Sequence, residues 1–262
     1  MTLSLLLDKI NTYSNRMTIV SLPYYENIMS TQTKTKRPNN TLLEIIFNIA
    51  IPSIILMKLS GAEYLGSVNA LVLALLFPLI YGVYDFVKNK SMNFISLLGF
   101  LSTLLTGGIG LFELDVEWLA IKEAAIPSVI GLVVLVSGFW GKPLIAKILL
   151  NPMLFNLDLI YQTLSEQNKT EAFKSKVQRG NHLLSITFIF SATMNYLLAK
   201  WIVVSPAGTA QFNEQLGEMT LWSYPVIAIP SMIMMMAIMF YVVKGVMKLT
   251  GLTFEQILNA EK

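Results

Sequence analysis

The feature that most constrains this chain is a pair of long apolar segments between Met92 and Leu144, joined by a very short acidic turn. Each segment is about twenty residues long, which is what a helix with a rise of about 1.5 Å per residue needs to cross roughly 30 Å of hydrocarbon. The turn between them, Glu113 to Glu117, carries three carboxylates, which are costly to remove from water. The sequence therefore predicts a hairpin of two membrane-spanning helices.

The composition extends this prediction to the whole chain. Of its 262 residues, 54% are hydrophobic and only 13% are charged, whereas a soluble domain carries about 25% charged residues. Cysteine is absent and His182 is the only histidine, which excludes disulfides, thiolate metal sites and a multi-histidine metal centre. No Ser/His/Asp set and no basic-aromatic patch for nucleic acid occurs. We therefore expect a membrane protein that is not an enzyme, with no cofactor and no nucleic-acid partner.

The predicted fold class is all-α, a polytopic bundle of six transmembrane helices within residues 42–248. Four spans are added to those of the hairpin, at about 42–57, 68–87, 183–204 and 221–243. Residues 1–41 are expected to form a largely disordered cytoplasmic tail, and residues 249–262 a short cytoplasmic tail. Met29 is an alternative start to Met1, and the sequence favours neither.

The distribution of Lys and Arg predicts the orientation, because cytoplasmic loops are enriched in both. Sixteen of the 19 basic residues fall before the first span, after the second and fourth spans, or after the sixth. The opposite side carries carboxylates and only Lys58, Lys122 and Lys200. Six spans with both termini in the cytoplasm fit this pattern, and we expect a bacterial inner membrane.

Residues 144–165 are predicted to form a cytoplasmic helix lying in the membrane interface. Its apolar residues recur at helical spacing and its polar residues lie off that face; the apolar set is Met153, Leu157, Ile160, Tyr161 and Leu164. Asn151-Pro152 and Asp158 argue against a seventh span. Residues 165–180 are then expected to return to water.

Three predicted spans contain the same four-residue motif, Ala-Ile-Pro-Ser. Its prolines are Pro52, Pro127 and Pro230. Proline inside a membrane helix removes a hydrogen bond and kinks the helix, and a nearby serine can take up the loss. The first and fourth spans run in opposite directions, so their shared word suggests a 3+3 inverted repeat of the kind found in transporters. Chance recurrence of short apolar words is the alternative.

Five polar residues at membrane depth are the candidate functional or packing residues: Asp85, Lys122, Glu123, Asn195 and Lys200. Lys122 and Lys200 lie near helix ends, where their side chains can reach the interface, and Asp85 lies close to Lys88. Glu123 is too short to reach water and is expected to pair with Lys200. Asn195 should hydrogen-bond to a neighbouring helix. The glycines of Thr106–Gly110 should permit close helix contact.

The hairpin and the fifth span resemble the intracellular septation protein A family of inner-membrane proteins. The shared motifs follow one another in the family's order: Gly107-Gly108, Asp115, Lys122, Gly141-Lys142-Pro143-Leu144, and Asn195-Tyr196-Leu-Leu-Ala199. The segments 78–86 and 93–99 are similar to a related group of bacterial membrane proteins, some of which carry a transporter label. Where the septation family has a Lys-Trp-Lys-Pro-like cluster, this chain has Ala120-Ile-Lys122-Glu123, and the loop that follows is longer.

The resemblance implies a function in cell-envelope maintenance or septation through membrane lipids or through envelope or division proteins. It implies no defined reaction. A small secondary transporter, with a site between the proline-containing helices near Glu123 and Asn195, is the alternative. The sequence does not indicate an oligomeric state.

Overall fold

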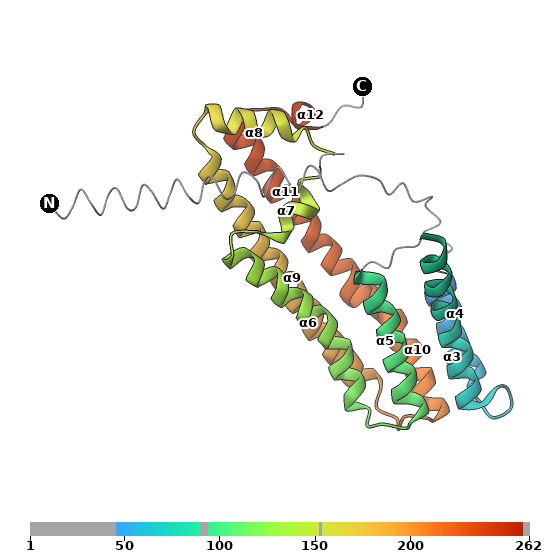
Figure 1. The fold of residues 1–262 in the computed structure, drawn as a ribbon. Helices are drawn as coiled ribbons and strands as arrows, with labels where there is room; N and C mark the ends of the chain where they lie inside the picture. The colour runs from blue at the N-terminus through green and yellow to red at the C-terminus, as the bar shows by residue number, and fades with distance from the viewer. Residues whose placement is uncertain (1–45, 90–93, 152–153, 259–262) are drawn as a thin grey trace. The chain divides into compact units, whose positions relative to one another are not determined.

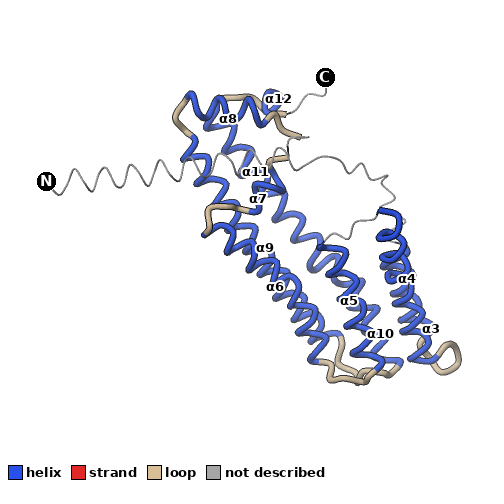
Figure 2. The backbone as a smooth tube through the Cα atoms, in the orientation of Figure 1, coloured by secondary structure: helices blue, strands red, loops and turns tan. Residues whose placement is uncertain are grey.

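The computed structural model describes residues 46–89, 94–151 and 154–258, and every regular element within these ranges is a helix (Figure 1). Short loops join the helices, as Figure 2 shows. The chain divides into two compact units. The described part of unit 1 lies within Gly131–Ile186 and Met235–Lys262, and that of unit 2 within Arg37–Ile130 and Thr187–Met234.

The described residues of unit 2 form two π-helices and four complete α-helices: η1 (Ile46–Ala50), α3 (Ile51–Leu59), α4 (Gly66–Asn89), α5 (Phe94–Leu111), α10 (Ala210–Ser223) and η2 (Tyr224–Ala228). Unit 1 contains α7 (Leu144–Leu149), α8 (Leu157–Glu166) and α12 (Phe254–Ile257). Three longer helices have residues in both units: α6 (Glu117–Phe139), α9 (Thr170–Ile202) and α11 (Ile229–Thr250).

Four helices in the described ranges are long and apolar enough to cross a membrane: Gly66–Tyr84, Glu117–Phe139, Thr170–Ile202 and the continuous stretch Ala210–Thr250. They overlap the second, fourth, fifth and sixth predicted spans, and the last two extend well beyond the predicted bounds of about 183–204 and 221–243. Helix α5 occupies the third predicted span, and its described apolar part, Leu98–Leu111, is shorter. The first predicted span begins outside the described residues and continues as η1 and α3.

The segment before the sixth predicted span differs from the expectation. The sequence predicts no helix between the fifth and sixth spans, but residues 210–223 form α10, which runs directly into η2 and α11. The face of α10 formed by Phe212, Leu216 and Met219 is buried, with Phe212 fully so. These apolar residues recur every three or four positions among glutamine, asparagine and glutamate, so the helical pattern is present but its mean hydropathy is low.

Glycines bring the helices of unit 2 close together, as the small-residue pattern predicted. A Cβ atom at Gly217 of α10 would lie 2.9 Å from the carbonyl oxygen of Ser53 in α3. A Cβ at Gly110 of α5 would collide with Leu71 of α4 and would approach the Phe212 ring to 3.3 Å. Gly217 therefore requires glycine, because the obstacle there is a backbone atom of α3, whereas a side chain at Gly110 would require Leu71 to shift.

The three Ala-Ile-Pro-Ser motifs do not share one backbone conformation. In the first and sixth predicted spans a five-residue π-helix ends at the alanine, and proline is the second residue of the α-helix that follows. Helix α6 instead continues as an α-helix through Pro127. The wider π turn accommodates residues that cannot donate to the i−4 carbonyl. Local structure thus pairs Pro52 with Pro230, and the 3+3 inverted repeat remains a prediction.

In unit 1 the predicted interfacial helix at 144–165 consists of two separate helices, α7 and α8. Leu157, Ile160 and Leu164 of α8, which were expected to face lipid, are buried within the protein, each at most 4% exposed. The buried core of this unit also includes Phe173 of α9 and Ile257 of α12. An amphipathic helix pattern cannot distinguish a lipid surface from a protein surface as the apolar neighbour.

The described part of the predicted C-terminal tail, residues 249–258, contains the end of α11 and the short helix α12. Gly251 takes a positive φ of 78°, which ends α11, and Thr253 with Gln256 forms a capping box that starts α12. The Asn156 N–H donates to the Ile257 carbonyl at 2.9 Å, and the Ile257 side chain is 1% exposed. This short segment is therefore packed against the start of α8.

Candidate functional site

A buried cation lies in the second turn of α6. The Lys122 side chain is 8% exposed, and its ammonium is 2.6 Å from the Glu123 carboxylate. It also donates to the Thr106 hydroxyl of α5 at 2.6 Å, and that hydroxyl donates to the Ser102 carbonyl at 3.0 Å. Lys122 is thus compensated in charge and bonded to the neighbouring helix, which is what a buried ammonium requires.

The expected pair between Glu123 and Lys200 does not form. Lys200 pairs with Glu117, at 2.5 Å, and both side chains are exposed. The Lys200 ammonium also lies 5.9 Å from the Tyr196 ring centre. Glu117 is the first residue of α6 and precedes Glu123 by six residues, about 9 Å along the helix. Lys200 therefore lies beside the N-terminal end of α6 and not beside its second turn. An exposed pair of this kind contributes little to stability.

Asn195 does not join this cluster. The amide of Asn195 donates to the Ser191 carbonyl at 2.8 Å and lies 3.3 Å from the Ser191 hydroxyl, both one turn back in the same helix. The expected bond to another helix is therefore replaced by a local one. Asp85 lies on α4, and its side chain is outside the described residues.

A buried hydrogen-bond network around Asn181 in unit 1 was not predicted from the sequence. The fully buried Asn181 of α9 donates to the Val134 carbonyl of α6 at 2.6 Å and accepts from the Ile145 N–H at the start of α7 at 3.1 Å. Ser137 accepts from the Leu144 N–H at 3.2 Å and lies 3.4 Å from the Asn181 amide. Together these bonds fix the turn that connects α6 to α7.

Two further side chains of α9 extend this contact along α6. Gln178 donates to the Gly138 carbonyl at 3.1 Å, and Ser185 donates to the Gly131 carbonyl at 3.0 Å. A Cβ at Gly138 would lie 2.9 Å from the Asn181 amide nitrogen. The spacing of Gln178, Asn181 and Ser185, three and then four residues apart, is the sequence signal that could have identified this face.

The C-terminal end of α11 is bonded to the connection between α8 and α9. Gln167 donates to the Thr250 carbonyl and Lys169 to the Leu249 carbonyl, each at 2.9 Å. The last carbonyls of a helix have no partners within it, and a cation is favoured there. These two bonds satisfy carbonyls that α11 alone would leave open.

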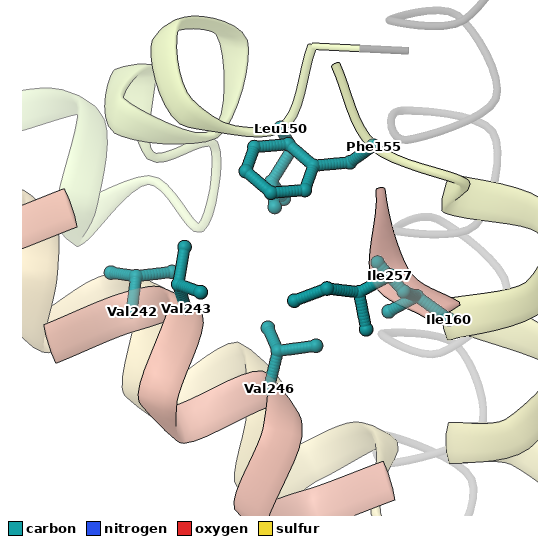
Figure 3. Close-up of a pocket in the computed structure, with 7 residues that line it drawn as sticks. All are labelled: Leu150, Phe155, Ile160, Val242, Val243, Val246 and Ile257. Atoms are coloured by element: carbon teal, nitrogen blue, oxygen red, sulfur yellow. The ribbon is translucent and has the colours of Figure 1, made fainter. Parts of the chain in front are cut away.

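An apolar pocket lies between α8, α11, α12 and the chain before α8 (Figure 3). Figure 3 shows Phe155, Ile257 and Val246 among the seven side chains around it, all aliphatic or aromatic. Its volume is about 10 Å³, room for a single water at most. It reaches neither Glu123 nor Asn195, so it is a packing gap and not a substrate site.

Neither a metal site nor a known relative indicates the chemistry of the described residues. Among the described residues, no group of three or more His, Asp or Glu side chains is placed to hold a metal ion. No protein-family model matches the chain, and neither do any curated protein or any solved structure. The arrangement therefore has to be interpreted from its own contacts.

Proposed function

We propose that the chain is a multi-pass protein of a bacterial inner membrane, with six spans and both termini in the cytoplasm. We further propose that it acts in cell-envelope maintenance or septation by contacting lipids or other envelope proteins, without catalysing a reaction. The observation that carries this proposal is the excess length of α9 and of the α10–α11 stretch, combined with the charge at one of their ends.

Helix α9 has 33 residues, about 50 Å, and the stretch Ala210–Thr250 has 41 residues, about 60 Å. A bilayer needs only about 30 Å, so both continue beyond it. The described part of unit 1 contains four carboxylates against eight basic residues: Lys142, Lys147, Lys169, Lys174, Lys176, Arg179, Lys244 and Lys248. The basic excess supports a cytoplasmic location for the extended ends.

Exposed tryptophans support the placement of α6 across the bilayer. Trp118 is 59% exposed and Trp140 is 78% exposed. They are 22 positions apart, and 22 residues of α-helix rise about 33 Å, which is close to the roughly 30 Å of the hydrocarbon layer. Tryptophan is enriched at both membrane interfaces. Between these two, α6 exposes Ile121, Val129 and Leu132, which suit contact with acyl chains.

Single-cysteine labelling tests the topology cleanly, because the natural chain has no cysteine. In intact cells we expect a membrane-impermeant maleimide to label Glu63→Cys and Asp115→Cys. Ser165→Cys and Gln256→Cys should react only after the membrane is opened. Labelling of Ser165→Cys or Gln256→Cys in sealed cells would refute the proposed orientation, and protection of Glu63→Cys would refute six spans.

Site-specific photocrosslinking tests the envelope function. Asp158 and Gln162 lie on the exposed side of α8, opposite its buried face. With a photoreactive residue at either position in native membranes, we expect crosslinks to envelope or division proteins or to lipid. A probe at the buried position Leu164 is the matched control. Adducts confined to unrelated proteins at all three positions would contradict the proposal.

A second candidate, a small secondary transporter, is favoured by one observation. The hydroxyls of Ser53 and Ser231, which follow Pro52 and Pro230, are buried with no hydrogen-bond partner among the described residues. π-helical turns are frequent at functional sites, and a functional role is one explanation for a buried hydroxyl without a partner. The transporter would use Glu123 or Asn195, and removal of the Lys122–Glu123 pair, argued in the Discussion, separates the two candidates.

A further inference from the structure

One face of α11 changes from apolar to basic along a single row. Met236, Phe240, Lys244 and Lys248 follow at intervals of four residues, which places them one above the next on the helix surface. Met236 is 55% exposed and Phe240 is 65% exposed, and both lysines are also exposed. The Lys244 ammonium lies 5.6 Å from the centre of the Phe240 ring. The change of polarity therefore occurs within one helical turn.

A third lysine reaches this row from α9. The Lys176 ammonium lies 4.5 Å from the centre of the Tyr241 ring. Its aliphatic chain crosses α11 at Gly245, where a Cβ would lie 2.8 Å from Lys176 Cδ. Tyr241 is three residues before Lys244 and seven before Lys248, so the three share one side of α11. The absence of a side chain at Gly245 leaves room for Lys176, which therefore lies beside the row.

Within the described residues, none of the three ammonium groups is paired with a carboxylate. The ion pairs found among the described residues are Lys122–Glu123, Lys174–Glu171 and Lys200–Glu117. None of them involves Lys176, Lys244 or Lys248. Three cations on one face repel each other, and an anion between them would relieve that repulsion.

We propose that this face of unit 1 binds one anionic phospholipid. The phosphate lies among the ammonium groups of Lys176, Lys244 and Lys248, and an acyl chain lies along Phe240 and Met236. The shared chemistry is that of any phosphate, but the adjoining exposed apolar residues favour a lipid over a free ion. The inference rests on the proposed function in one respect, namely that the basic ends of α9 and α11 emerge at the cytoplasmic leaflet.

The test uses the full chain in uncharged detergent. Binding of phosphatidylglycerol is measured by native mass spectrometry, with phosphatidylcholine of the same chains and inorganic phosphate as parallel arms. We expect the anionic lipid to bind more tightly than the zwitterionic one. Each lysine near a membrane surface should be worth about fivefold, so K176Q/K244Q/K248Q should weaken phosphatidylglycerol binding by roughly 100-fold. The exposed set K142Q/K147Q/R179Q removes the same charge elsewhere in unit 1 and should weaken it by less than about fivefold.

Two results would overturn the site. Equal losses in both triple variants would mean general attraction to basic charge, and displacement of the lipid by equimolar inorganic phosphate would mean a free-anion site. Phe240→Ala adds a check that leaves the charge unchanged. It should weaken lipid binding and leave the binding of inorganic phosphate unaffected. Topology labelling is independent of all these arms, so failure of the lipid site and failure of the proposed orientation would be told apart.

Discussion

Asn181→Ala is expected to destabilise unit 1 by about 2.5 kcal/mol, because the change leaves a buried N–H without a partner. The Asn181 side chain is the acceptor for the Ile145 N–H and the donor to the Val134 carbonyl, and the residue is completely buried. An unsatisfied buried donor costs about 1–3 kcal/mol, and the shortened side chain adds a cavity next to Gly138. The turn between α6 and α7 should then lose its fixed geometry.

The measurement is reversible unfolding in mixed micelles, together with hydrogen exchange at the Ile145 amide. Exchange at that amide should accelerate by about 50-fold if the loss is local to α7. Asn195→Ala is the matched control, since it removes the same side chain from the same helix. Asn195 bonds only to Ser191 of its own helix, so we expect its loss to cost about 0.5 kcal/mol or less. Equal losses of stability in the two variants would show that the hydrogen bonds of Asn181 do not hold α6, α7 and α9 together.

These two asparagines also mark how far the sequence predicts the structure. Asn195 lies in the middle of a predicted span, where a polar side chain attracts attention, yet it makes a local bond. Asn181 lies just before the predicted start of that span, next to a segment expected to be in water. It was missed because α9 continues as one helix from Thr170 to Ile202, and hydropathy detects only the part that lipid would surround.

The same reason explains the elements that were found and those that were not. Continuous apolar runs identified α4, α6, α9 and α11, because a lipid-facing helix must be apolar along its length. Helix α10 was missed because it packs on α3 and α4 and needs apolar residues on one side only. The predicted partner of Glu123 was wrong because hydropathy gives the depth of a residue in the membrane only to within several residues. Whether two side chains form an ion pair depends on a shift of about one helical turn.

Glu123→Gln is expected to cost about 2 kcal/mol, because it leaves the buried Lys122 ammonium without a carboxylate to balance its charge, while the hydrogen bond to the Thr106 hydroxyl remains. Breaking a fully buried pair costs about 3–5 kcal/mol, and the 23% exposure of the Glu123 side chain reduces that figure. Lys122→Met should cost about 1–2 kcal/mol, since the remaining carboxylate is the more exposed partner. The double change K122M/E123Q should restore stability to within about 1 kcal/mol of the natural chain, because both charges are then gone.

The two single variants and the double variant also distinguish the two candidate functions. If the pair serves only to join α5 to α6, the double variant should fold and complement loss of the natural protein as well as the unchanged chain does. If Glu123 takes part in transport, the double variant should be equally stable but inactive, and Lys122→Met alone should retain more activity than Glu123→Gln. The envelope proposal predicts the first result, because it places the contacts at the exposed surface and requires no charge at membrane depth. A stable, inactive double variant would therefore transfer the function from that surface to the buried pair between α5 and α6.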